Sequence, residues 1–132
     1  MRVEKVIITF GRMRVIAAFE DGERRYTDPE IAGRALETYP NLGIHSCINP
    51  KGPTFGAVIG HTSIAHLIEH LMIAEQSIMA AEKGMKDVTF VGNTHWIDEG
   101  RGLAEMQVSF IDDLDAATAL SNALAAVASF CE

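Results

Sequence analysis

The sequence has little cysteine and no long apolar run, and these absences exclude several classes of protein. Its 132 residues include two cysteines, Cys47 and Cys131, too few for the disulfide framework of a small secreted domain. No stretch of about 18 apolar residues occurs, and the first residues lack the apolar segment of a signal peptide. We therefore expect a cytoplasmic protein with reduced thiols and no membrane association.

Basic residues are also scarce. The chain has 11 Lys and Arg against 18 Asp and Glu, which gives a net charge of -7. Proteins that bind nucleic acid through its phosphates present clustered Lys and Arg, and no such cluster occurs here, so nucleic acid is not an expected partner. The length fits a single domain over residues 1–132. A positive mean hydropathy indicates apolar surface that a homo-oligomer would cover.

Hydrophobic periodicity and turn residues predict an α+β fold. The expected elements are strands 3–10 and 14–20, a helix from 28 to 39, a helix from 62 to 83, strands 86–97 and 103–111, and a helix from 112 to 130. Asp28 as N-cap with Pro29 behind it marks the first helix. The order ββ-α-α-ββ-α predicts a two-layer sandwich, in which two hairpins form an antiparallel sheet and the helices cover one face. The segment 42–60 is rich in glycine and proline and reads as a long binding loop.

The stretch "HTSIAHLIEH", residues 61–70, lies in the longest expected helix. On a helical wheel, His66, Glu69 and His70 share one face, whereas His61 falls away from them. Most of the remaining circumference is apolar, so this face is expected to be buried. A carboxylate buried beside two imidazoles needs charge partners, and a divalent metal would provide them. The spacing His-x-x-Glu-His is the inverted form of the zincin motif.

The alternative is a hydrogen-bonded core pair of His66 and Glu69, with His70 donating to a backbone carbonyl. The combination of the motif with a long preceding loop favours the metal site. A catalytic zinc takes three protein ligands, so one more is required from outside the helix. His45 in "GIHSC" ranks first and Cys47 second. His95, Asp98 and Glu99 in "THWIDEG" remain further candidates.

The stretch "YPNLGIHSCINPKGPTFGAVIGHTSIAHLIEHLMIAEQ" resembles the N-terminal domain of cyanophycin synthetase. The similarity runs from about residue 38 to 130 and includes the later "MQVSF" strand and the alanine-rich final helix. The residues that carry it are Leu42, His45, Cys47, Phe55, Thr62, His66, Glu69, His70 and Gln76. The motif alone is also similar to that of pitrilysin and insulinase peptidases. Pro53 and Thr54 in place of paired glycines, together with Ala65 and His61, depart from the pattern and leave the substrate open.

The resemblance implies binding of a peptide polymer such as cyanophycin and its metal-dependent hydrolysis. It does not imply ligation, because the ligase domains of the synthetase do not fit in this length and no phosphate-binding loop is found. The first hypothesis is a zinc-type amide or peptide hydrolase, with His66, His70 and His45 as ligands and Glu69 as the general base. The alternative is a non-catalytic module that binds a peptide polymer or has a regulatory role.

Overall fold

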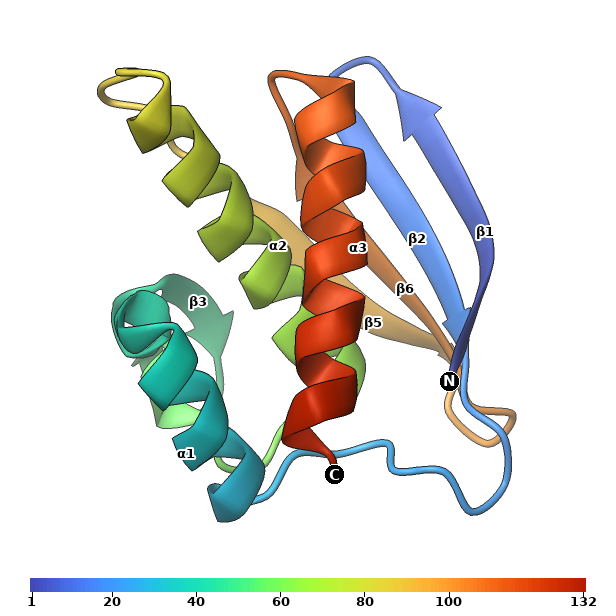
Figure 1. Ribbon diagram of the computed structural model, residues 1–132. Coiled ribbons are helices and arrows are strands. Elements are labelled where there is room, and N and C mark those ends of the chain that lie inside the picture. The colour runs from blue at the N-terminus through green and yellow to red at the C-terminus, as the bar shows by residue number, and fades with distance from the viewer.

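A four-stranded antiparallel sheet forms one layer of the molecule (Figure 1). The computed structural model describes residues 1–132. The strands are β1 (Arg2–Thr9), β2 (Arg12–Ala18), β5 (Gly92–Asp98) and β6 (Leu103–Ser109). Their spatial order is β1-β2-β6-β5, so that β1 and β5 are the edge strands. The two hairpins that the sequence predicts thus join through the antiparallel pairing of β2 with β6.

Helices form the second layer, on one face of the sheet. These are α1 (Pro29–Thr38), α2 (Ile64–Glu82) and α3 (Asp113–Phe130), and α2 and α3 lie side by side in front of the sheet in Figure 1. Each begins at a side-chain cap that satisfies a free backbone N–H. Asp28 accepts from the N–H of Ile31 at 2.8 Å, and Ser63 accepts from the N–H of His66 at 3.0 Å. The predicted α+β class is confirmed.

The segment between α1 and α2 contains more structure than the loop expected over residues 42–60. A 3-10 helix (Pro40–Ile44) leads into a hairpin of β3 (Ser46–Asn49) and β4 (Gly52–Thr54), and a second 3-10 helix (Phe55–Ala57) follows. Asn49 closes the hairpin, since its Oδ1 accepts from the N–H groups of Lys51 and Gly52 at 2.9 and 3.0 Å. The expected strand 86–97 is shorter than predicted, because residues 86–91 precede β5 and form no strand.

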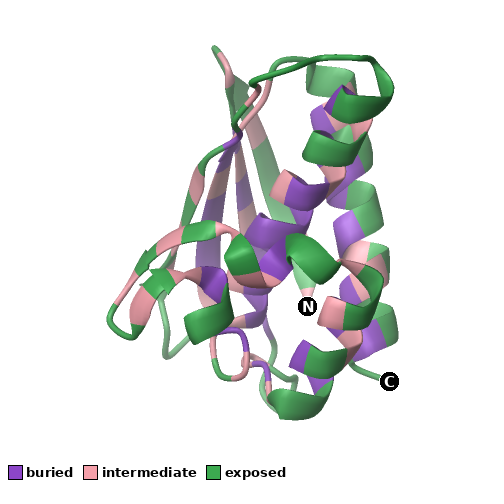
Figure 2. Ribbon diagram, turned by 90° about the vertical axis from the view of Figure 1, so that its left-hand side faces the viewer, coloured by how far each residue is buried: buried purple, intermediate pink, exposed green.

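The core lies between the sheet and the helices, where Figure 2 shows the buried residues gathered. Alternate residues of β2 and β6 face the helices, as the period of a strand requires. They are Met13, Val15 and Ala17 of β2 and Ala104, Met106 and Val108 of β6. The first two turns of α2 enter this core, which confirms the expected burial of that helix and places its polar residues inside the molecule.

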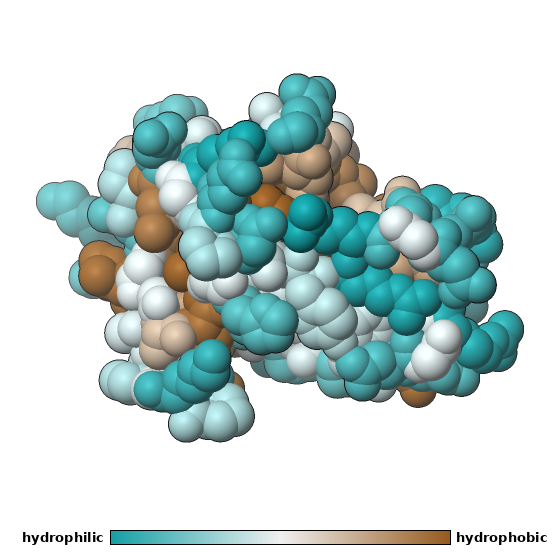
Figure 3. Space-filling view, turned by 90° about the horizontal axis from the view of Figure 1, so that it is seen from below, coloured by the Kyte–Doolittle hydropathy of each residue, from teal (hydrophilic) through white to brown (hydrophobic).

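The outer surface is mixed in character. Seen from below, hydrophilic side chains cover much of the molecule, and hydrophobic side chains emerge between them in separate patches (Figure 3). None of the helices combines the length and the apolarity that crossing a membrane would require.

Candidate metal centre

The first two turns of α2 supply His66, Glu69 and His70. The imidazole rings of His66 and His70 lie 4.9 Å apart between centroids, and Glu69 Oε2 lies 3.6 Å from His70 Nε2. Glu69 is 3% exposed and His70 2% exposed, whereas His66 is half-buried. The helical spacing that places these residues on one face therefore brings them together at the edge of the core.

The β3 strand brings Cys47 to the same point. Its Sγ lies 3.4 Å from His66 Nε2. One ligand atom from each of Cys47, His66 and His70 lies within 4.8 Å of the other two, and this group could hold a metal ion. Cys131, the other thiol, is exposed and lines a separate apolar groove at the end of α3.

The donor set suits zinc in its chemistry, and the separation of Cys47 from His66 also suits it in spacing. Nitrogen and sulfur are its preferred donors, and three protein ligands leave one position of a tetrahedral site open for chemistry. With bonds of about 2.1 Å to nitrogen and about 2.3 Å to sulfur, two ligands of one tetrahedral ion lie roughly 3.6 Å apart. The observed separation of 3.4 Å between Sγ of Cys47 and Nε2 of His66 is close to this value.

Hydrogen bonding at Nδ1 orients His66. Thr62 Oγ1 lies 2.8 Å from this nitrogen, so Nε2 is the nitrogen that faces Cys47. Thr62 is itself held by the buried Thr27, whose Oγ1 accepts from the N–H of Thr62 at 2.8 Å. The N–H of Thr27 donates in return to the carbonyl of Thr62 at 2.7 Å. Metal-binding histidines regularly have such a hydrogen-bond partner on the ring nitrogen that faces away from the metal, here called the outer nitrogen.

His70 is fixed by two neighbours from the segment that precedes α2. His45 Nδ1 lies 3.1 Å from His70 Nδ1, so one of these two nitrogens carries a proton and donates it in a hydrogen bond to the other. Phe55 stacks on the His70 ring, with the ring centroids 4.0 Å apart and an interplanar angle of 13°. The His70 ring is thereby held in one orientation.

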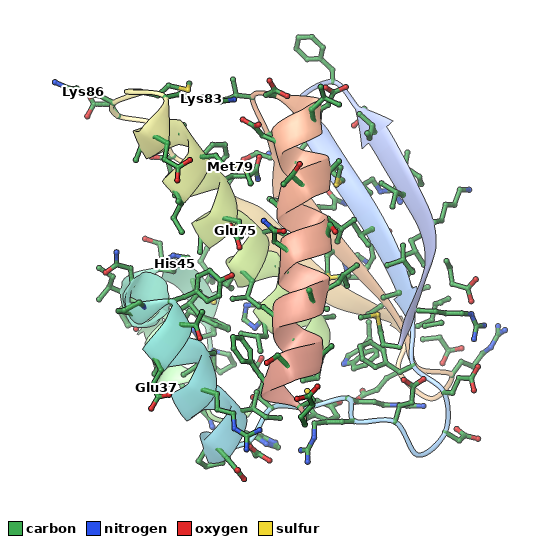
Figure 4. The ribbon with its side chains drawn as sticks, viewed as in Figure 1. Glu37, His45, Glu75, Met79, Lys83 and Lys86 are labelled. Carbon is green, nitrogen blue, oxygen red and sulfur yellow. The ribbon has the colours of Figure 1, made fainter.

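The predicted third ligands fall in different places. Cys47 joins the two histidines, whereas His45 reaches the outer nitrogen of His70; Figure 4 labels His45 in the segment that follows α1. The residues of "THWIDEG" do not join the group. His95 pairs with Glu105 across β5 and β6, Asp98 accepts from the N–H of Arg101, and Glu99 accepts from the hydroxyl of Tyr26.

Glu69 occupies a narrow space between α2 and β5. Its Oε1 accepts a hydrogen bond of 2.8 Å from Thr94 Oγ1. Gly92 on the same strand makes the approach possible, because a Cβ there would lie 3.0 Å from Glu69 Cγ and 3.1 Å from its Oε2. A side chain at position 92 would therefore press on the carboxylate, and glycine leaves the room that Glu69 uses.

Burial sets the protonation of the site. It lowers the pKa of His70 to about 3, with the neighbouring His66 and His45 adding to the effect. Burial also lowers the pKa of His66 and of His45, so that all three rings are neutral at pH 7 and have a lone pair available. Burial raises the pKa of Glu69 to about 7, although the hydrogen bond from Thr94 acts in the opposite direction. A carboxyl group with a pKa in this range suits general acid and base catalysis.

A cleft of about 600 Å³ gives access to the candidate metal centre. One wall is β3 with Cys47 and Ile48, the other is the segment 88–94, and Glu69, His66 and His70 form the floor. A second cavity of about 430 Å³ adjoins it, and Ile48, His66 and Thr94 line both. The candidate centre thus lies inside a continuous groove that is open to solvent.

No protein-family model matches the chain, and no curated protein matches it either. The assignment of the candidate centre therefore depends on its geometry alone. Two contributors were missed by the sequence analysis: Thr94, which holds Glu69, and Gly92, which admits it. Both lie on β5, more than twenty positions after Glu69 in the sequence, and no local pattern around them indicates the contact.

Proposed function

We propose that this chain is a zinc-dependent hydrolase of amide bonds. One observation carries the proposal: a thiol and two neutral imidazoles converge beside a buried carboxyl group, at the floor of an open cleft. A structural zinc site is normally closed by four protein ligands. Here three converge and the cleft leaves room for a substrate, which favours a catalytic role.

Each residue of the site has a distinct role in this proposal. Cys47, His66 and His70 would hold the zinc. When bound there, such an ion supplies Lewis-acid chemistry, polarising an amide carbonyl and making water more acidic. Glu69 takes the proton from the attacking water and passes it to the leaving nitrogen. Thr94 holds the carboxylate of Glu69 towards the cleft, and Thr62 and His45 hold the two imidazoles.

The substrate class follows from the resemblance to the cyanophycin synthetase N-terminal domain. We propose a peptide, with cyanophycin-like polymers as the first substrates to assay. A role as a stand-alone binding module is the outcome that remains if the metal is held and no bond is cleaved.

The test measures metal content and turnover in the same preparations. Protein purified without chelators should contain one zinc per chain, and His66→Ala should lose it. Glu69→Gln should keep the zinc and lose turnover by about a thousandfold, since it removes the proton acceptor and no ligand. Cys131→Ser is the control, because it changes an exposed thiol that lines a different cavity and should keep both the zinc and the turnover.

Two results would contradict the proposal. The first is native protein that binds no divalent metal at neutral pH. The second is zinc-loaded protein that is inert towards a broad panel of peptides and cyanophycin-like polymers and is indistinguishable from Glu69→Gln.

A further inference from the structure

The free edge of β5 presents unpaired backbone groups to the cleft. The N–H of Ser109 on β6 donates to the carbonyl of Val91 at 2.8 Å, which fixes the alternation of the ladder. Asn93 and His95 therefore direct their backbone groups towards β6. Gly92, Thr94 and Trp96 direct theirs to the opposite side, where no backbone or side-chain group of the chain pairs with them. They are half-buried along the groove, so their polar groups are partly withdrawn from water.

The groove follows this edge for most of its length. The larger cavity borders residues 88–94 and the smaller one residues 94–96, and the opposite wall in both is the β3 hairpin. From Gly92 to Trp96 the strand spans about 14 Å, which matches four to five extended residues. Ile48 on the opposite wall is fully exposed and lines both cavities, so an apolar side chain stands over the groove.

The two edges of the sheet differ in their protection against pairing. β1 has Arg2, Glu4 and Lys5 along it and a bulge between Val3 and Lys5, features that discourage the addition of another strand. The β5 edge from Gly92 to Trp96 has no Asp, Glu, Lys, Arg or Pro, and its irregularity falls only at its far end, between Trp96 and Asp98. The open edge is thus the one that borders the metal centre.

We propose that the substrate binds as an extended polypeptide strand that pairs with the free edge of β5. This proposal rests on the proposed function and specifies how its substrate is held. Main-chain pairing at Gly92, Thr94 and Trp96 supplies the binding, which is independent of substrate sequence. Thr94 sets the position, because the same residue holds Glu69 by its side chain and pairs with the substrate by its backbone. The substrate residue opposite Thr94 therefore lies next to the metal centre.

The first experiment follows backbone hydrogen exchange in zinc-loaded Glu69→Gln protein, in which turnover is absent. The probe is the acetylated and amidated hexapeptide Thr-Val-Thr-Val-Thr-Val. At saturating peptide, the N–H groups of Gly92, Thr94 and Trp96 should exchange about tenfold more slowly, because they acquire acceptors. Those of Asn93 and His95 should not change, since they are already paired with β6. This alternation at every second residue is specific to strand addition.

A second experiment methylates the peptide nitrogens one at a time. Methylation removes a donor, so binding should weaken about tenfold at the positions that face β5. On the protein side, Ile48→Lys should weaken binding of the same peptide by about fivefold through the loss of apolar contact in the groove. Ile44→Lys is the matched control, since Ile44 is 76% exposed in the same segment and lines neither cavity.

The outcomes separate this proposal from the proposed function. Slower exchange at alternate residues without any hydrolysis by the native protein would uphold the docking edge and reject the enzyme. Cleavage of acetyl-alanine amide as fast as of the hexapeptide, with exchange at Gly92, Thr94 and Trp96 unchanged, would uphold the enzyme and reject strand addition. Slower exchange that appears only as protein concentration rises, without peptide, would show that a second copy of the chain occupies the edge and would overturn the proposal.

Discussion

Thr94 Oγ1 donates a hydrogen bond of 2.8 Å to Glu69 Oε1, and this contact joins the sheet to α2. The donor lies on an edge strand and the acceptor in the second turn of α2. Because Glu69 is buried and has few polar neighbours, this bond is the main one that fixes the direction of its carboxylate.

Thr94→Val should reduce turnover without loss of metal. The substitution keeps the β-branched shape and removes the hydroxyl, so the carboxylate of Glu69 loses its orientation. We expect kcat to fall by about 10- to 100-fold, the range found when outer partners of metal sites are removed, with KM and zinc content unchanged. Thr94→Ser retains the donor and should restore most of the activity. A Thr94→Val variant with full kcat would show that Thr94 does not position the carboxylate of Glu69.

Gly92→Ala should destabilise the protein. A Cβ at this position would lie 2.5 Å from the carbonyl oxygen of Gln107 and 3.0 Å from Glu69 Cγ, so both β6 and the carboxylate must shift. We expect the free energy of unfolding to fall by about 2 kcal/mol, measured by urea denaturation.

Gly33→Ala is the matched glycine control. Gly33 is exposed in α1 and an added Cβ meets nothing within 4 Å, so this variant should gain about 0.5–1 kcal/mol from helix propensity. Equal effects of the two substitutions would show that the space around Gly92 is not restricted.

Cys47→Ala and His45→Ala should separate a ligand from a residue that orients one. Cys47 lies with the imidazoles of His66 and His70 in the candidate metal group, whereas His45 is outside that group and hydrogen-bonds to Nδ1 of His70. We expect Cys47→Ala to lose stoichiometric zinc, and His45→Ala to retain it with an affinity lowered about 10- to 100-fold. Competition with a chromogenic chelator measures both. The reverse pattern, zinc lost with His45 and kept without Cys47, would make His45 the third ligand.

The ion pair between Arg14 and Glu105 should make stability depend on acid pH. Arg14 donates two hydrogen bonds to the buried Glu105, at 3.1 and 2.9 Å, and together with Gln107 it lowers the pKa of that carboxyl to about 2. Because the folded-state pKa lies below the ordinary value of 4.5, this contribution is complete above about pH 4.5 and is lost as the pH falls towards 2.

Urea midpoints measured from pH 6 to pH 2.5 test this expectation. The native protein should lose more stability over the interval than Glu105→Gln, which cannot titrate. Glu30→Gln is the control, because Glu30 pairs with Arg34 on the exposed surface of α1. A pH profile of Glu105→Gln that matches the native profile would show that the pair adds nothing.

Local signals account for the parts of the fold that the sequence predicted. Asp28 and Ser63 cap their helices through side-chain oxygens that sit at fixed spacings from the N–H groups they bind, so both starts could be read from a few residues. The spacing of His66, Glu69 and His70 is equally local. In contrast, β3 and β4 are four and three residues long, too short to show a period, and the Asn49 side chain that closes them resembles an ordinary loop residue.

The sequence could not decide between His45 and Cys47 as the candidate third ligand. His45 and Cys47 are two positions apart, and a small change in the turn before β3 exchanges which of them reaches the site. The contacts of Thr94 and Gly92 with Glu69 depend on the docking of β5 against α2, which no neighbouring residue specifies. The helical spacing thus predicts that His66, Glu69 and His70 lie together, and the approach of Cys47, Thr94 and Gly92 to them depends on tertiary packing.

The short hairpin between α1 and α2 has a consequence for folding. Cys47 and His66 are 19 positions apart, and a shared ion would tie them into a ring in the chain. By analogy with a disulfide across a ring of this size, such a tie removes about 3 kcal/mol of chain entropy from the unfolded state. The fraction of chains that are folded would then depend on the zinc concentration, whether or not the protein also cleaves a bond.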